Sequence, residues 1–108
     1  MRFVKAAQLS DLLADDAVRV EVEGTPVAVV RVRDEVFAVS DVCTHEDTSL
    51  AEGFVEGYAL ECPLHGASFD VRTGEVLALP ATRNLPTYPV RVEGDDVLVG
   101  IEDQQETT

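Results

Sequence analysis

All the cysteines and histidines of this chain lie in two short segments. Cys43 and His45 form a Cys-x-His pair, and Cys62 and His65 form a Cys-x-x-His pair. Sixteen residues separate the two pairs. Thiolate and imidazole side chains bind transition metals well. Because each residue type occurs only twice and all four residues fall in two matched segments, the spacing predicts a metal centre.

Two simpler chemistries explain less of this pattern. A disulfide between Cys43 and Cys62, as in small secreted domains, leaves both histidines without a role. A structural zinc site also takes two cysteines and two histidines. Zinc modules usually pair like residues along the chain, whereas each pair here is mixed. A zinc-stabilised binding module stays as an alternative, and colour and iron content distinguish it from an iron–sulfur protein.

The sequence around these residues resembles the Rieske signature for a [2Fe-2S] cluster. The similarity to bacterial Rieske ferredoxins extends over most of residues 2–101. The stretches that carry it are Cys-Thr-His at 43–45, Cys-Pro-Leu-His-Gly at 62–66 and Phe-Asp-Val-Arg-Thr-Gly at 69–74.

The resemblance implies one cluster whose ligands alternate between two loops. Cys43 and Cys62 would hold one iron, and His45 and His65 would hold the other. Each loop thus gives one ligand to each iron, so both loops must be in place before either iron is fully bound. Such a cluster transfers single electrons and makes or breaks no substrate bond. We therefore expect an electron-transfer component and not an enzyme in its own right.

Among Rieske proteins, the chain is similar to the ferredoxins of bacterial aromatic-ring-hydroxylating dioxygenase systems. The similarity implies that it accepts electrons from a flavin-dependent NAD(P)H reductase and passes them to a terminal oxygenase. Oxygenase catalytic subunits add a large domain with a mononuclear iron bound by two histidines and a carboxylate, and this chain has no further histidine. The alternative is a small subunit of a nitrite reductase or of another redox complex, although many nitrite reductase small subunits lack the four ligands present here.

Two neutral imidazoles in place of two thiolates raise the reduction potential, to about −150 to +300 mV against about −400 mV for plant-type ferredoxins. Rieske relatives in respiratory cytochrome bc complexes add a disulfide and two hydroxyl donors to sulfur. The corresponding positions are Thr48 and Leu64 for the disulfide, and Ala67 and Phe69 for the hydroxyls. Because those devices are absent, we expect a potential near the bottom of the range, about −150 mV.

The chain is strongly acidic, with a formal net charge of −13 and a sequence pI near 4.2. Nucleic acid is a poor partner, because phosphate binding needs clusters of lysine and arginine and the eight basic residues are scattered. Nine acidic residues and no basic one lie between Asp34 and Val71. They oppose adding an electron to the cluster, and they form either a solvated surface or a docking face for a basic partner. The nine are Asp34, Glu35, Asp41, Glu46, Asp47, Glu52, Glu56, Glu61 and Asp70.

No stretch approaches the roughly 20 apolar residues that a membrane helix needs. Acidic residues after Lys5 interrupt any signal-peptide core, so the expected location is the cytoplasm, without membrane contact. At 108 residues, with 45% hydrophobic and 27% charged residues, the chain is expected to form one domain. We expect a monomer.

Short alternating segments separated by turn residues predict an all-β fold. The Rieske resemblance implies two packed antiparallel sheets, as a small sandwich or partial barrel, with a cluster-binding subdomain inserted at about residues 41–80. The domain would span residues 1–101, and 102–108 would be a polar tail. The expected strands are 2–7, 18–23, 26–32, 35–40, 58–61, 90–93 and 96–101.

Several residues are expected to shape turns and loops. Ser10 would cap one short helical turn. Pro63 and Gly66 would shape the second ligand loop, since proline fixes its own φ and glycine permits a left-handed turn. The segment Leu79-Pro80-Ala81 would cover the cluster, as a third loop does in the family. The prolines from residue 80 onward predict an extended loop or an edge strand.

Overall fold

The computed structural model of the chain describes residues 2–43, 48–63, 66–79 and 83–101. Within these ranges the chain forms short β-strands and two single turns of 3-10 helix, η1 and η2, neither of which is long and apolar enough to cross a membrane. The elements are β1 (Arg2–Gln8), η1 (Leu9–Asp11), β2 (Asp16–Val22), β3 (Thr25–Val32), β4 (Glu35–Ser40), η2 (Leu50–Glu52), β5 (Phe54–Glu56), β6 (Ala59–Glu61), β7 (Ser68–Asp70), β8 (Val76–Ala78), β9 (Thr87–Tyr88), β10 (Val90–Glu93) and β11 (Asp96–Ile101).

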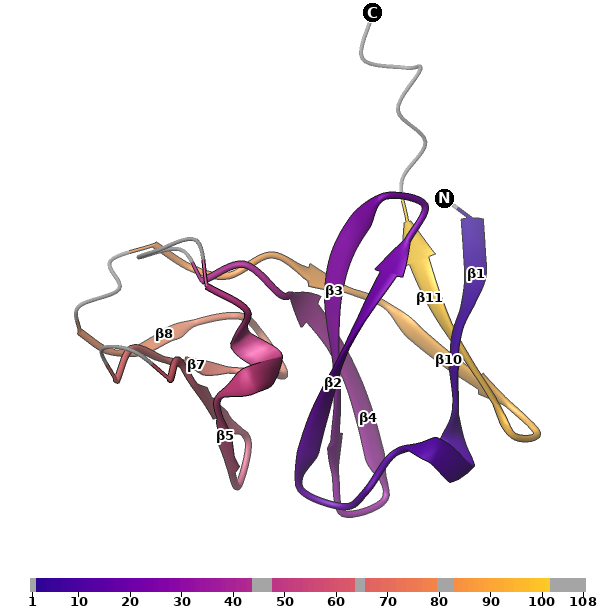
Figure 1. Ribbon diagram of the computed structural model, residues 1–108, viewed down its shortest axis with the longest axis horizontal. Coiled ribbons are helices and arrows are strands. Elements are labelled where there is room, and N and C mark those ends of the chain that lie inside the picture. The colour runs from indigo at the N-terminus through magenta and orange to yellow at the C-terminus, as the bar shows by residue number, and fades with distance from the viewer. Residues whose placement is uncertain (1, 44–47, 64–65, 80–82, 102–108) are drawn as a thin grey trace, which may run out of the picture.

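The strands form three antiparallel sheets, in the orders β1-β11-β10, β2-β3-β4-β9 and β5-β6-β7-β8. In Figure 1 the strands β2, β3 and β4 lie between the other two groups, with β1, β10 and β11 on one side and β5, β7 and β8 on the other. The third sheet is inserted in the sequence between β4 and β9 of the second. The predicted all-β fold is confirmed, and the described strands form no closed barrel.

Strand β3 separates two hydrophobic cores, which explains why its sequence is apolar almost throughout. Ala28, Val30 and Val32 pack in the core that contains both cysteines. Val27 and Val29 pack in the other core, with residues of β11. Because successive side chains of a strand point to opposite faces, one strand lines both cores. A strand that is covered on both faces needs apolar residues at nearly every position.

The expectation that Ser10 caps a helical turn is wrong. The turn η1 follows Gln8, and no side chain caps it. The Ser10 hydroxyl instead donates to the Asp95 carboxylate at 2.9 Å, and the Ser10 N–H donates to the same carboxylate at 3.1 Å. A hydrogen bond to a charged carboxylate is stronger than one between neutral groups, such as the bond that a serine cap makes. Ser10 therefore anchors η1 to the turn between β10 and β11.

The proline-rich segment contains the edge strand that the sequence predicts. Strand β9 pairs with β4 at the edge of the second sheet, and it lies between Pro86 and Pro89. Proline lacks an N–H donor and is tolerated at sheet edges. Pro80 and Ala81 of the expected cover, and the polar tail 102–108, lie outside the described residues.

Candidate metal centre

The first ligand loop, residues 43–48 (loop 1), begins shortly after β4. Its base is an isolated bridge between Val42 and Ser49. The Cys43 N–H donates to the carbonyl oxygen of Thr48 at 3.1 Å, which closes the loop. The Cys43 side chain is buried, with 3% of the residue exposed. His45 lies outside the described residues.

The second ligand loop, residues 62–67 (loop 2), joins β6 to β7. The Cys62 N–H donates to the carbonyl oxygen of Ala67 at 2.7 Å, so both loops are closed by the cysteine N–H and a carbonyl five residues later. Cys62 is 1% exposed. Gly66 has a φ of +77°, which confirms the left-handed turn expected there. His65 also lies outside the described residues.

Gly53 holds the two loops close together. It follows η2, and a Cβ atom built on it would lie 1.8 Å from the backbone oxygen of Glu61. The chain that leaves loop 1 therefore passes directly over the residue before Cys62. Any larger residue at position 53 must push these two backbone segments apart.

We expect Gly53→Ala to lower the free energy of unfolding by about 1–3 kcal/mol, the usual range for overpacking, because the added Cβ meets backbone that cannot move aside. Chemical denaturation followed by circular dichroism measures the loss. The control is Gly94→Ala, where no atom lies within 4 Å of the new Cβ and only the positive φ of 62° opposes alanine. An equal or smaller loss in Gly53→Ala would contradict the close approach.

Both cysteines lie in one hydrophobic core, beside Leu60, Ala67 and Phe69, and they are not joined in a disulfide. The structure thus brings the two predicted thiol ligands to the same region. Among the described residues, no three Cys, His, Asp or Glu side chains gather as a metal site, and the segments 44–47 and 64–65 lie outside these residues. Those segments contain both predicted histidine ligands.

One buried hydroxyl beside loop 1 fits a sulfur-containing group. In the described part of the chain, Ser49 Oγ is the one buried side-chain nitrogen or oxygen without a hydrogen-bond partner. Buried polar atoms are rarely left unsatisfied. The sulfides of an iron–sulfur cluster accept hydrogen bonds from nearby donors. Together with two buried thiols, this donor fits an iron–sulfur cluster better than a disulfide.

The acidic segment is less negative than its sequence indicates. Within the described part of the chain, arginines from outside the segment form ion pairs with three of its carboxylates, two of them at 2.8 Å and one at 3.9 Å. These charges therefore oppose adding an electron less than the sequence alone predicts. The pairs are Arg19–Asp41, Arg72–Asp70 and Arg31–Asp34.

A polar and aromatic contact joins the third sheet to β4. The Tyr58 hydroxyl donates to Glu35 at 2.5 Å, which raises the pKa of Tyr58. The Arg72 guanidinium lies 4.1 Å from the centre of the Tyr58 ring. Arg72 also donates to Asp70 at 2.8 Å, and this hydrogen bond holds the pKa of Asp70 below its ordinary value. Tyr58 and Arg72 lie in the turns that connect the strands at the ends away from loop 2.

The Arg72–Asp70 pair makes stability depend on pH. Because the folded-state pKa of Asp70 is depressed, the pair stabilises the fold above the unfolded value of about 3.9, and this contribution is lost as pH falls through the folded pKa. We expect Arg72→Gln to lower the thermal midpoint more at pH 6 than at pH 3, as measured by circular dichroism. Arg91→Gln, which breaks the exposed pair with Glu93, is the control. A pH-independent difference would contradict the assignment.

Two positioning features were not recognised in the sequence. Asp41 is fully buried two residues before Cys43, and Arg19 reaches it from β2 at 2.8 Å. Arg19 lies in a strand where apolar and charged residues alternate, and this pattern indicates only that its side chain is on the solvent-exposed face. Gly53 similarly reads as a turn glycine. Arg19 and Asp41 are 22 positions apart. Gly53 meets Glu61 through the pairing of β5 with β6, and this register is not visible in the residue pattern.

Comparison with known proteins places this site in a family. The chain matches the Rieske [2Fe-2S] domain over residues 2–89. It is 40% identical over 101 residues to the ferredoxin component of the naphthalene 1,2-dioxygenase system of Pseudomonas putida, covering 94% of this chain and 97% of that protein.

Two solved structures are similar over the same part of the chain. The ferredoxin of carbazole 1,9a-dioxygenase from Nocardioides aromaticivorans has a TM-score of 0.90 and 36% identity, covering 94% of this chain and 100% of that one. The ferredoxin in a complex of reduced oxygenase and oxidized ferredoxin in carbazole 1,9a-dioxygenase has a TM-score of 0.87 and 38% identity, covering 94% and 95%. The family match decides between zinc and iron–sulfur in favour of the latter. The chain belongs to the Rieske [2Fe-2S] domain family, and it is a ferredoxin that carries one [2Fe-2S] cluster and transfers single electrons.

Proposed function

We propose that this protein is the ferredoxin component of a multicomponent oxygenase system. It accepts single electrons from an NAD(P)H-dependent flavin reductase and delivers them to a terminal oxygenase that hydroxylates an aromatic ring. The observation that carries the proposal is similarity to dioxygenase ferredoxins over nearly the full length of both chains. The structure of a related ferredoxin in complex with its oxygenase supports the choice of acceptor. Because NAD(P)H is a cytoplasmic reductant, we propose a cytoplasmic location. We also propose that the protein is a monomer.

The proposed cluster ligands are Cys43 and Cys62 on one iron, and His45 and His65 on the other. The cluster, when bound, supplies a centre that gains and loses one electron. The chain itself buries both thiols and fixes each cysteine by its own N–H. Burial excludes water from the cysteine side of the site.

Reconstitution tests the proposal directly. The reduced protein is expected to show the EPR spectrum of a mixed-ligand [2Fe-2S] cluster. Adding NADH, the flavin reductase of a naphthalene dioxygenase system and its oxygenase is expected to give product formation that depends on this ferredoxin. A protein that shows the EPR spectrum but is not reduced by any NAD(P)H-dependent flavin reductase would contradict the proposed partner. A colourless protein that contains zinc would contradict the cluster itself.

Exposed carboxylates near the ligand loops are expected to steer a basic partner. Glu52 and Glu61 are exposed, and each lies within a few residues of a loop. Charges of this kind raise association rates at low salt, and screening sets in over about 10 Å at 0.1 M ionic strength. We expect the rate of electron transfer to the oxygenase to fall with ionic strength.

The variant Glu52→Gln/Glu61→Gln is expected to lower the association rate with the oxygenase about tenfold at low salt. Its matched control is Asp11→Asn/Glu93→Gln, which removes two exposed charges remote from the loops along the chain. Stopped-flow oxidation of the reduced ferredoxin measures both rates. Equal rates for the two variants, or a wild-type rate that salt does not change, would argue against steering.

A further inference from the structure

Asp41 is the one buried polar or charged residue among those that the structure describes, with 0% of its surface exposed. It lies where the chain leaves β4 and two residues before Cys43. A buried carboxylate is costly unless it is paired and hydrogen-bonded. Its presence at the entrance to loop 1 therefore needs a structural account.

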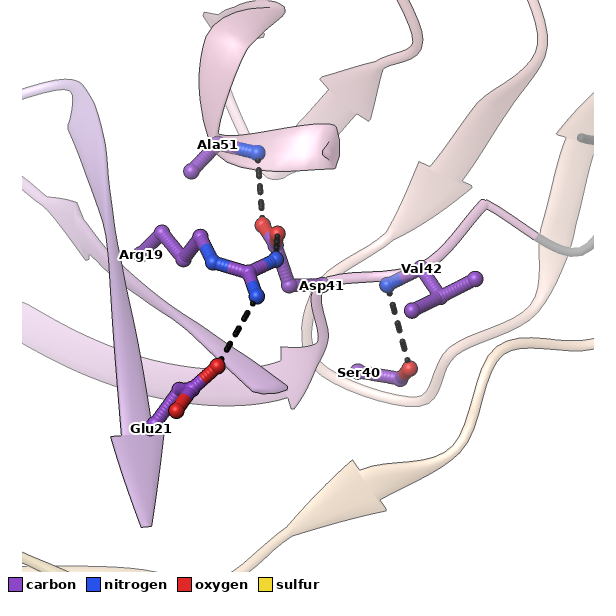
Figure 2. Close-up of polar contacts among 6 residues, drawn as sticks. All are labelled: Arg19, Glu21, Ser40, Asp41, Val42 and Ala51. Carbon is purple, nitrogen blue, oxygen red and sulfur yellow. Dashed lines mark hydrogen bonds and ion pairs between the residues drawn. The ribbon is translucent and has the colours of Figure 1, made fainter. Parts of the chain in front are cut away.

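Every polar group of Asp41 has a partner in a different part of the fold. One carboxylate oxygen accepts from Arg19 of β2 at 2.8 Å, and the other accepts from the Ala51 N–H of η2 at 2.9 Å (Figure 2). The Asp41 N–H donates to the carbonyl of Pro26 in β3 at 3.1 Å. The Asp41 carbonyl accepts the Leu50 N–H at 2.7 Å.

These contacts join the entrance of loop 1 to its exit. The turn η2 follows the loop, and the residue before it, Ser49, makes no side-chain cap. Asp41 supplies the missing acceptors, because it takes the N–H groups of Leu50 and Ala51. Arg19 also donates to Glu21 at 3.2 Å (Figure 2), so its guanidinium is fixed between two carboxylates of the same region.

Loop 2 is held at its ends in a different way. Its two ends continue into β6 and β7, which pair at three successive positions. The ends of loop 1 are joined by a single isolated bridge, Val42 to Ser49, which is flanked by the Cys43–Thr48 and Asp41–Leu50 backbone hydrogen bonds. The Ser40 hydroxyl accepts the Val42 N–H at 3.3 Å and adds one local contact (Figure 2). The Asp41 contacts thus hold the ends of loop 1 together, as the pairing of β6 with β7 holds the ends of loop 2.

We propose that Asp41, oriented by Arg19, is a positioning residue that holds loop 1 ready to bind the cluster and so controls how firmly the cluster is retained. The proposal rests on the ligand assignment given above. Loss of a group that orients metal ligands typically costs 10–100-fold in metal affinity. The measurement is the rate at which the visible absorbance of the holoprotein bleaches in excess chelator.

We expect Asp41→Ala to bleach at least about tenfold faster than wild type. Arg19→Met is expected to bleach faster as well, and Arg19→Lys is expected to recover part of the loss, because lysine keeps the charge without the planar fork of arginine. The EPR lines of the Asp41 variant are expected to broaden, since a loosely held loop gives a spread of ligand geometries. Unchanged bleaching in all three variants would overturn the proposal.

Two further variants separate positioning from stability. Val97→Ala destabilises the core remote from the cysteines, and we expect it to bleach at the wild-type rate with unchanged EPR lines. Arg19→Met/Asp41→Leu removes both charges, so its stability is expected to recover while its bleaching stays fast, because the Ala51 N–H still lacks its acceptor. If Val97→Ala bleached as fast as Asp41→Ala, the role would be structural only. A wild-type protein without a Rieske EPR signal would instead refute the proposed function.

Discussion

The Cys62→Ser variant is expected to purify without the red-brown colour and without an EPR signal after reduction. Serine is a hard, protonated oxygen donor at neutral pH, whereas iron–sulfur clusters are held by soft thiolates. Removal of one thiolate leaves the iron bound to cysteine with a single protein ligand. Iron and acid-labile sulfide are both expected to fall below a tenth of the wild-type content, and the same holds for Cys43→Ser.

The His65→Cys variant tests whether His65 is a ligand of the cluster. A cysteine keeps a donor at this position but returns one negative charge to the cluster, so the cluster is expected to assemble with a lower potential. Rieske clusters, with two histidine ligands, have potentials from about −150 mV upward, whereas plant-type clusters with four cysteines lie near about −400 mV. Replacing one of the two histidines is therefore expected to lower the potential by on the order of 100 mV. Ser68→Ala, just beyond loop 2, is the control. An unchanged potential in His65→Cys would rule out His65 as a ligand.

Adding hydroxyls beside the cysteines is expected to raise the reduction potential. The wild-type midpoint is expected near −150 mV, the bottom of the Rieske range, because Ala67 and Phe69 offer no donor to sulfur. Both residues are fully buried in the core that contains Cys43 and Cys62. The Ala67→Ser/Phe69→Tyr variant places two hydroxyls there, where respiratory Rieske proteins carry them.

The expected size of this shift follows from hydrogen-bond energies. A hydrogen bond to a charged acceptor contributes about 1.5–3 kcal/mol, and a one-electron couple shifts about 59 mV per 1.4 kcal/mol, so each bond adds up to about 60–130 mV. Potentiometric titration by EPR or visible absorbance measures it. Phe37→Tyr, near Tyr58 and away from the loops, is the control and should leave the potential unchanged. A double variant that keeps the wild-type midpoint would show that positions 67 and 69 do not face sulfur.

A metal centre could be predicted from the sequence because ligand chemistry belongs to residue types, and the Rieske resemblance indicated which cofactor it holds. The alternating ligation by two loops is implied only by the resemblance to Rieske proteins, and it stays a prediction. The edge strand after Pro86 was also predictable, because proline restricts its own backbone wherever it stands. The all-β fold was predictable from the alternation of apolar and polar residues in β2 and in the hairpins, because strand periodicity is a local property.

The errors concern residues whose roles depend on distant partners. Ser10 was expected to cap a turn, but Asp95 offers it a carboxylate from a different hairpin. The sequence shows the acidic segment without basic residues, whereas arginines from neighbouring strands and turns pair with some of its carboxylates. In both cases a long-range ion or hydrogen bond overrides the local pattern, because charged acceptors bind more strongly than neutral ones.

The sequence by itself indicated a metal centre, two candidate ligand loops and the strand character of the chain, since each depends on residue type and short spacing. Only the tertiary structure decided how loop 1 is held. Arg19 and Asp41 are 22 positions apart and meet because β2 and the end of β4 both flank β3. Gly53 meets Glu61 because β5 pairs with β6 in the register that sets Phe54 opposite Glu61. Sheet order and close packing create these contacts, and neither is encoded by a local pattern.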